Sequence, residues 1–236
     1  MKKHIVVLTG AGISAESGLR TFRDADGLWE GHEVTKVATP AAWETDPRLV
    51  LQFYNERRTQ LLQAKPNQAH LLLARLQTDF QVTIITQNVD DLHERAGSMD
   101  VIHLHGELLK VRSTSHPQLV YRCETDIHMG DLCDHGSQLR PHIVWFGESV
   151  PMIESAAQTT TSADYLMIVG TSLQVYPAAG LMAYAPPDTP TFYIDPRPSM
   201  SYELGQAKNL QVIEKPATSG VQKAYDLIYQ AEKILP

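Results

Sequence analysis

The chain has 236 residues, enough for one α/β core with a small appended module but too few for three independent domains. Its 27 acidic and 20 basic side chains give a formal net charge of −7, which offers no electrostatic reason to bind nucleic acid or an anionic membrane. Two cysteines are too few for a disulfide scaffold, and no apolar run is long enough for a secretory signal or a membrane span, so we expect a cytoplasmic, monomeric protein.

Seven short apolar runs bounded by turn residues predict buried strands of a parallel sheet. Stretches with apolar residues at helical spacing lie between most of them. Alternation of strands and helices with short links predicts an α/β fold with a doubly wound sheet. The predicted strands are His4–Thr9, Gln81–Thr86, Val101–Leu104, Ile143–Phe146, Tyr165–Val169, Thr191–Asp195 and Leu210–Ile213, and the predicted helices are Leu49–Ala64, Asn67–Gln77, Ala178–Tyr184 and Ser219–Ile234.

Two regions interrupt this alternation. The first runs from about Glu16 to Ala64, and the second, Glu107 to Arg140, is polar and mixed without a clear core period. We interpret them as insertions that pack together into a smaller module beside the sheet.

A glycine-rich loop, Gly10-Ala11-Gly12-Ile13-Ser14-Ala15, follows the first predicted strand. Glycines here allow a tight turn and a close approach of backbone N–H groups to a pyrophosphate. The spacing departs from the usual G-x-G-x-x-G because residue 15 is alanine, so a purely structural turn stays open as an interpretation. Arginines and aromatic residues follow up to Trp29; arginine can pair with phosphate, and a large ring can shield a reactive sugar from water.

Five segments of the chain resemble the sirtuin family of NAD-dependent deacylases, in the family's order and spacing and over about its whole length. The resemblance implies one catalytic domain, 1–236. Within it, 1–30, 65–106 and 141–236 would form a Rossmann-like NAD-binding part, and 31–64 and 107–140 a small inserted module. The matching segments are Gly10–Trp29, Thr86–Asp90, His103–Gly106, Val144–Glu148 and Gly170–Leu173.

The resemblance implies that NAD is consumed as an acyl group leaves a protein lysine, giving nicotinamide, O-acyl-ADP-ribose and free lysine. It makes His105 the general base that takes a proton from a ribose hydroxyl, a task suited to a histidine of near-neutral pKa. Asn88 would orient the ribose hydroxyls or a water, and Asp90 would accept from the carboxamide, although both are also ordinary turn residues. We expect the nearby His103 to point to the opposite face from His105. The implied NAD contacts are Gly10, Ala11, Gly12, Ala15, Phe22, Arg23, Trp29, Gln87, Asn88, Asp90, Gly170, Thr171, Ser172, Asp195 and Ala217.

Two of these contacts carry a qualification. Phe22 matches the family's shielding aromatic, with ordinary core packing as the other interpretation. Asp195 stands where many sirtuins have asparagine, yet an acidic residue can still bond ribose hydroxyls. A further segment is implied to offer backbone to an extended substrate peptide by β-augmentation, which a buried strand would also allow. That segment is Val144, Trp145, Phe146, Gly147 and Glu148.

Tyr54 and Arg57 lie at i and i+3 of a predicted helix and therefore on one face. The pair resembles the Tyr-x-x-Arg of sirtuins that prefer acidic acyl groups such as succinyl or malonyl. A guanidinium pairs with a carboxylate and a phenol adds a donor, whereas the alternative is a solvated helix face. Arg58, one step round the helix, serves as a comparison.

Most sirtuins hold a structural zinc with four cysteines, which suit a tetrahedral ion. Here Ser113 stands where related sequences have the first cysteine. The residues that could form a mixed site have a spacing that fits no common zinc pattern. We therefore predict that zinc is absent, with a module that depends on packing alone and a looser or partly mobile 107–140 stretch. The mixed-site candidates are Cys123, Cys133, His135 and either His128 or His116.

Other activities stay open on the same NAD site. One is a protein mono-ADP-ribosyltransferase or a lipoamidase-like deacylase; another is a non-catalytic sensor of NAD or ADP-ribose. Tyr54 and Arg57 favour removal of acidic acyl groups, and His105 disfavours a mere sensor, which has no need of a base. The expected partners are proteins carrying acyl-lysine.

Overall fold

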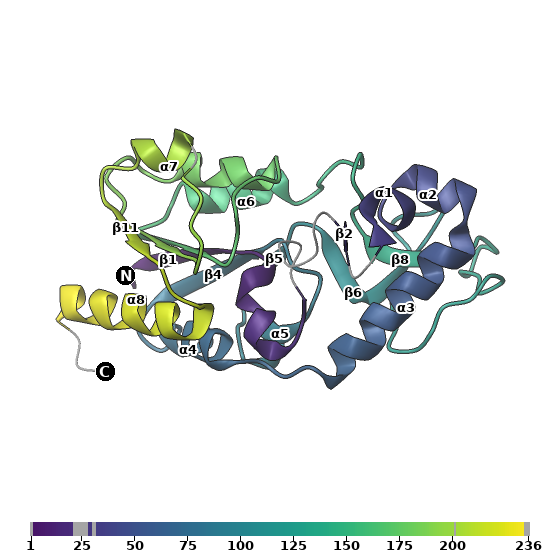
Figure 1. Ribbon diagram of the computed structural model, residues 1–236, viewed down its shortest axis with the longest axis horizontal. Helices are drawn as coiled ribbons and strands as arrows, with labels where there is room; N and C mark the ends of the chain where they lie inside the picture. Colours follow the sequence, from purple (N-terminus) through teal and green to yellow (C-terminus); the bar gives the residue numbers. More distant parts are fainter. Residues whose placement is uncertain (1, 21–27, 30–31, 201, 234–236) are drawn as a thin grey trace.

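A six-stranded parallel sheet organises the larger part of the chain (Figure 1). The computed structural model describes residues 2–20, 28–29, 32–200 and 202–233. The strand order is β11-β10-β9-β1-β4-β5, so it reverses at β1, the place where open α/β sheets bind ligands. The strands are β1 His4–Thr9, β4 Gln81–Thr86, β5 Val101–His103, β9 Tyr165–Val169, β10 Thr191–Ile194 and β11 Leu210–Ile213.

Helices cover both faces of this sheet, and each face has its own apolar cluster. In Figure 1, α4 (Gln68–Leu76) and α8 (Ala217–Glu232) lie below the sheet, with α6 (Ile153–Thr160) and α7 (Tyr202–Gln206) above it. The 3-10 helix η4, Ala178–Tyr184, packs beside α6. None of the described helices is long and apolar enough to cross a bilayer.

The small module combines three helices with an antiparallel sheet of order β7-β6-β8. Asp46 caps α3 by accepting from the Leu49 N–H at 3.0 Å, and Pro47 occupies the first turn, where its missing N–H costs nothing. The helices are α1 Val34–Val37, α2 Pro40–Thr45 and α3 Pro47–Gln63. The strands are β6 Gly106–Ser113, β7 Val120–Arg122 and β8 Leu139–Ile143, with a two-stranded ribbon, β2 Leu28–Trp29 and β3 His32–Glu33, beside them; the short helix α5, Leu92–Arg95, follows β4.

The doubly wound sheet and six of its predicted strands are confirmed to within one residue at their ends. The predicted strand Ile143–Phe146 is wrong. Ile143 instead ends the antiparallel β8, and the chain turns after it. The sequence Ile-Val-Trp-Phe has the apolar composition of a buried parallel strand. Ile143 and Trp145 are indeed buried, but their side chains pack into the core of the small module and not against the large sheet.

Candidate active site

A cavity of about 710 Å³ opens at the carboxyl ends of the parallel strands. Its walls are the loops that follow β1, β4, β5, β9 and β10, together with the start of α8 and one face of α3. This volume is in the range of small-molecule sites. The described residues that we expected to contact NAD or substrate all line it: Gly10, Ala11, Gly12, Ala15, Tyr54, Arg57, Gln87, Asn88, Asp90, His105, Val144, Trp145, Phe146, Gly147, Glu148, Gly170, Thr171, Ser172, Asp195 and Ala217.

Three of the residues expected to contact NAD cannot be placed in the cavity. Phe22 and Arg23 lie outside the described residues. Trp29 belongs to the two-residue strand β2, and its side chain lies outside the description as well.

The glycines of the first loop are required by the neighbouring loop. The Gly12 N–H donates to the Gly170 carbonyl at 2.8 Å, and a Cβ on Gly12 would come within 2.6 Å of the Gly170 Cα. Gly170 itself has φ +62°, in the left-handed region that favours glycine. Two loops on adjacent strands β1 and β9 thus approach too closely for side chains between them, which leaves backbone at the wall of the cavity.

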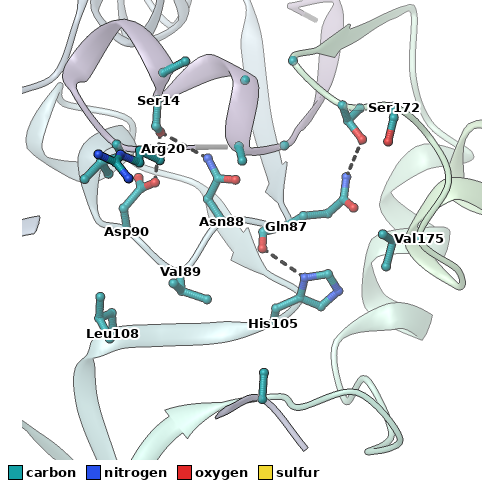
Figure 2. Close-up of a pocket in the computed structure, with 18 of the residues that line it drawn as sticks. Ser14, Arg20, Gln87, Asn88, Val89, Asp90, His105, Leu108, Ser172 and Val175 are labelled. Atoms are coloured by element: carbon teal, nitrogen blue, oxygen red, sulfur yellow. Dashed lines mark hydrogen bonds between the residues drawn. The ribbon is translucent and has the colours of Figure 1, made fainter. Parts of the chain in front are cut away.

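His105 has a defined protonation pattern (Figure 2). Its Nδ1 lies 3.0 Å from the Gln87 carbonyl oxygen, which can only accept, so Nδ1 carries the proton. Nε2 is therefore the basic nitrogen of a neutral ring. Burial lowers the pKa of His105 below its ordinary value, with the Gln87 hydrogen bond opposing, so the ring is neutral at pH 7.

Ser14 joins two of the expected residues and is a residue that sequence reasoning missed. Its hydroxyl donates to Asp90 Oδ2 at 2.9 Å and accepts from Asn88 Nδ2 at 3.2 Å (Figure 2). The Gln87 amide donates to Thr171 Oγ1 at 3.1 Å. Burial raises the pKa of Asp90, while the Leu92 N–H and the Ser14 hydroxyl oppose that shift. The available signal for Ser14 was a serine inside a glycine loop.

His103 does not line the cavity with His105. Strand alternation is the wrong reason for this, because residues two apart in a strand lie on the same face; the two side chains separate because β5 ends at His103 and His105 lies beyond it. Its Nε2 lies 2.6 Å from Glu94 Oε1 and its Nδ1 lies 3.3 Å from the Asn88 carbonyl oxygen. Burial lowers the pKa of His103, but the hydrogen bond and the charge of Glu94 outweigh it, so the pKa lies above its ordinary value. Two histidines two residues apart thus have opposite tendencies: His105 is kept neutral and His103 is pushed toward its charged form.

Tyr54 and Arg57 enter the cavity from α3. The Tyr54 side chain is fully buried, and the Arg57 side chain is 10% exposed with its guanidinium 4.8 Å from the centre of the Phe53 ring. Arg58 is different, because it is buried and donates to the Leu108 carbonyl and to Asn55 Oδ1. Position on the helix therefore separates an arginine that faces the cavity from one that holds the module together.

The segment after β8, residues 144–148, lines the cavity, but most of its backbone N–H groups are already bonded within the protein. The Val144 N–H donates to the His105 carbonyl, and the Phe146 N–H donates to the Ala38 carbonyl. The Trp145 N–H donates to Glu148 Oε2. An extended peptide that pairs with this segment would therefore have to bond to its carbonyl oxygens or to the Gly147 N–H. Fewer backbone groups are thus available for the expected β-augmentation than in a free strand edge.

The end of the cavity near Asp195 and Ala217, where we expected NAD contacts, is polar and tightly connected. Asp195 is buried, and its Oδ1 accepts from the Arg197 N–H at 2.8 Å. Ala217 is the first residue of α8, and next to it the Glu16 carboxylate accepts from the Thr218 N–H at 2.9 Å and from the Thr218 hydroxyl at 2.7 Å. The glycine loop and the last helix are thereby joined.

The positions that the resemblance assigns to zinc are closed by hydrogen bonds. Ser113 Oγ accepts from the His116 N–H at 3.1 Å, and the Cys133 thiol lies 3.2 Å from the same oxygen. Within the described part of the chain, no three histidine, cysteine or acidic side chains are grouped as a metal site. A hydroxyl in place of a thiolate does not fit the four-sulfur coordination that structural zinc favours.

The chain was compared with known proteins, and the Sir2 family matches residues 10–177. A relative from Helicobacter pylori (strain ATCC 700392 / 26695) named NAD-dependent protein deacylase is 55% identical over 220 residues, 93% of this chain and 95% of its own. One of the same name from Bacteroides thetaiotaomicron is 51% identical over 235 residues, 97% and 99% of the two chains.

Solved structures give the same answer. The crystal structure of a Sir2 homologue–NAD complex is 38% identical, with a TM-score of 0.85 over 98% of this chain and 91% of that one. A Sir2 protein with a deacetylated peptide and 3′-O-acetyl-ADP-ribose is 28% identical, with a TM-score of 0.80 over 99% and 95%. Because the family match and these relatives span most or nearly all of the sequence, the chain belongs to the Sir2 family, the sirtuins.

Proposed function

We propose that the chain is an NAD-dependent protein-lysine deacylase that favours succinyl and malonyl groups. The observation that carries the deacylase proposal is the fixed tautomer of His105: a neutral imidazole whose Nε2 is the basic nitrogen of a cavity at the carboxyl ends of the strands. A general base of this kind can take the proton of a ribose hydroxyl so that the hydroxyl attacks the acyl carbon. The names of the two bacterial relatives support the same activity.

The donors and acceptors around the cavity fit a dinucleotide. Asn88, Asp90 and Ser14 form a connected amide, carboxylate and hydroxyl group beside His105, suited to a ribose and a carboxamide. The loops after β1 and β9 present backbone at the switch point of the sheet, where such folds bind pyrophosphate. When bound there, NAD supplies the activated ribose that accepts the acyl group.

The preference for acidic acyl groups rests on Tyr54 and Arg57. Both line the same cavity as His105, although α3 belongs to the small module and His105 follows β5 of the large sheet. A largely buried guanidinium attracts a carboxylate more strongly than an exposed one, because water screens it less. Acetyl-lysine has no group that would use this charge.

The test is a set of lysine peptides that differ only in the acyl group: acetyl, succinyl and malonyl. Each is incubated with the protein and NAD, and nicotinamide, the free-lysine peptide and O-acyl-ADP-ribose are followed by mass. We expect all three products from the acidic substrates, with higher kcat/KM than for the acetyl peptide. ADP-ribose attached to the peptide would indicate the transferase, and binding of NAD without nicotinamide release would indicate a sensor.

A further inference from the structure

The hydroxyl of Tyr54 has a defined partner at the far wall of the cavity. Trp145 Nε1 donates to this oxygen at 3.0 Å. Both side chains are buried, at 0% and 2% exposure, so water does not compete for the bond. An indole N–H can only donate, and the bond therefore fixes where the phenolic oxygen lies.

Trp145 is itself held by a charged clamp. The Arg140 guanidinium carbon lies 3.2 Å from the centre of the Trp145 ring, and Arg140 Nη1 donates to Glu148 Oε1 at 2.7 Å. The other carboxylate oxygen, Oε2, accepts from the Trp145 N–H at 2.8 Å. Glu148 thus fixes the backbone of Trp145 and, through Arg140, the face of its ring.

A second arginine reinforces the clamp. Arg112 Nη2 lies 3.2 Å from both oxygens of Glu148. The side chains of Arg112 and Arg140 are only 16% and 10% exposed, and Glu148 is 21% exposed. Two guanidinium groups against one carboxylate leave an excess of positive charge in the clamp that holds Trp145.

We propose that Trp145 is a positioning residue for acyl selectivity, holding the Tyr54 hydroxyl where the far end of an acidic acyl group must be recognised. The clamp of Arg112, Arg140 and Glu148 keeps the indole in place. This inference rests on the proposed preference for acidic acyl groups. It gives Trp145 a role in the acyl end of the cavity through its side chain, distinct from the backbone contact to a peptide.

Loss of the indole N–H should affect acidic substrates selectively. A succinyl or malonyl carboxylate reaches toward Tyr54 and Arg57, whereas an acetyl methyl group is too short to make these contacts. Trp145→Phe keeps an aromatic ring against Arg140 but removes the donor. We expect its kcat/KM to fall roughly 3- to 10-fold more for succinyl and malonyl peptides than for the acetyl peptide, the effect of one neutral hydrogen bond.

Trp43→Phe is the matched control. The Trp43 ring packs against that of Trp145, with centroids 5.8 Å apart, and the same cluster holds both side chains. The Tyr54 hydroxyl accepts from Trp145 and not from Trp43, so we expect the selectivity to stay unchanged. Selectivity lost equally in Trp43→Phe would overturn the proposal, because general loosening of the cluster would then explain both variants.

A double-mutant cycle separates action through Tyr54 from direct action on substrate. In a Tyr54→Phe background, Trp145→Phe should cause no additional loss of selectivity, because the hydroxyl that it positions is already absent. Independent, additive losses would contradict the proposal. A wild-type enzyme equally active on acetyl and acidic peptides would instead refute the proposed acyl preference, and with it this inference, so the two failures are distinguishable.

A spectroscopic readout tests the contact apart from activity. The chain has three tryptophans, so a ¹⁵N–¹H spectrum should show three indole N–H signals, one of which disappears in Trp145→Phe. Tyr54→Phe should shift that signal and speed its exchange with solvent deuterium. An unchanged Trp145 signal in Tyr54→Phe would show that the hydrogen bond is absent and would overturn the proposal even if every variant were inactive.

Discussion

The large sheet and the small module contain different kinds of interior. Every residue of β1 and β9 is buried, and nearly all of those side chains belong to the two apolar clusters on the sheet's faces. In the module, β7 has no buried residue, and partly or fully buried polar groups such as Asn55, Arg58 and Glu148 connect α3, β6 and the segments around them. The sheet therefore provides a rigid edge for the cavity, and the module provides a polar wall, to which we assign the proposed discrimination between acyl groups.

The largest effect should come from the sheet side of the cavity. His105→Ala removes the base and should lower kcat/KM roughly 10²- to 10⁴-fold on acetyl, succinyl and malonyl peptides alike. Since burial lowers the pKa of His105, kcat/KM of the wild-type enzyme should rise with pH along a limb centred below 6.5. Steady-state kinetics over pH 5–8 check both.

The neighbouring histidine is the control for this variant. His103→Gln should cost far less activity, because His103 bonds to Glu94 outside the cavity. A loss as large as that of His105→Ala would show that the two rings share the task.

A buried histidine pair on the sheet side predicts acid sensitivity. The rings of His70 and His93 are 4.9 Å apart, and burial lowers the pKa of His70 to about 4 and that of His93 well below its ordinary value. In the unfolded chain both rings become protonated as the pH falls below 6.5. In the folded chain His70 does not become protonated until the pH reaches about 4. The stabilisation from both neutral rings should therefore be complete above pH 6.5 and be lost as the pH falls, with His70 alone accounting for on the order of 3 kcal/mol by pH 4.

Denaturant unfolding at pH 7 and pH 4.5 measures this loss. His70→Phe, which keeps a ring but cannot titrate, should reduce the difference between the two pH values. An unchanged difference would mean that other groups cause the acid sensitivity.

On the module side, Arg57→Met should act on selectivity. We expect kcat/KM to fall roughly 10- to 100-fold for succinyl and malonyl peptides, as for loss of charge-assisted hydrogen bonds, with the acetyl peptide little affected. Arg48→Met, at an exposed position of the same helix α3, is the control. Equal loss on the acetyl peptide would contradict the assigned role.

Glu148→Gln should destabilise the module by about 1–2 kcal/mol, because two largely buried guanidinium groups lose their carboxylate while residual water screens part of the cost. A lower Tm measures it. Glu124→Gln breaks the exposed pair with Arg122 in the same module and should change stability by less than about 0.5 kcal/mol. Similar shifts of Tm in both variants would mean that burial of the clamp adds nothing to the stability of the module.

The smallest effect concerns metal. If the Ser113–Cys133 contact closes the module without zinc, a chelator such as EDTA should leave both Tm and kcat/KM unchanged. Metal analysis of the purified protein provides the second check, with one zinc per chain as the contradicting result.

The same difference between the two regions decided what the sequence could predict. Fully buried strands such as β1 are continuous apolar runs, and a residue that follows such a strand, such as Asn88 after β4, has its place set by the edge of the sheet. The module offers no such pattern, since β6 combines buried and partly buried residues and β7 has no buried residue. Trp145 was predicted to lie in a strand that offers its backbone to a substrate peptide, and nothing in the sequence indicates the bond from its side chain to Tyr54, 91 positions away.

Hydrogen bonds between residues of different loops and helices were equally impossible to predict from the sequence. From the sequence, Ser14 is an ordinary turn serine, and its bond to Asp90 is not indicated. Arg58 likewise differs from Arg57 only once α3 packs against β6, where it donates to the Leu108 carbonyl. Contacts of this kind depend on where loops and helices meet in space, which hydrophobic periodicity does not encode.

The most direct measurement is a crystal structure of the protein with NAD and a succinyl-lysine peptide bound. It should place His105 Nε2 within roughly 3.2 Å of a ribose hydroxyl, with the succinyl carboxylate at Tyr54 and Arg57. A ribose bound away from the imidazole, with no water bridging the two, would contradict the catalysis proposed for this site.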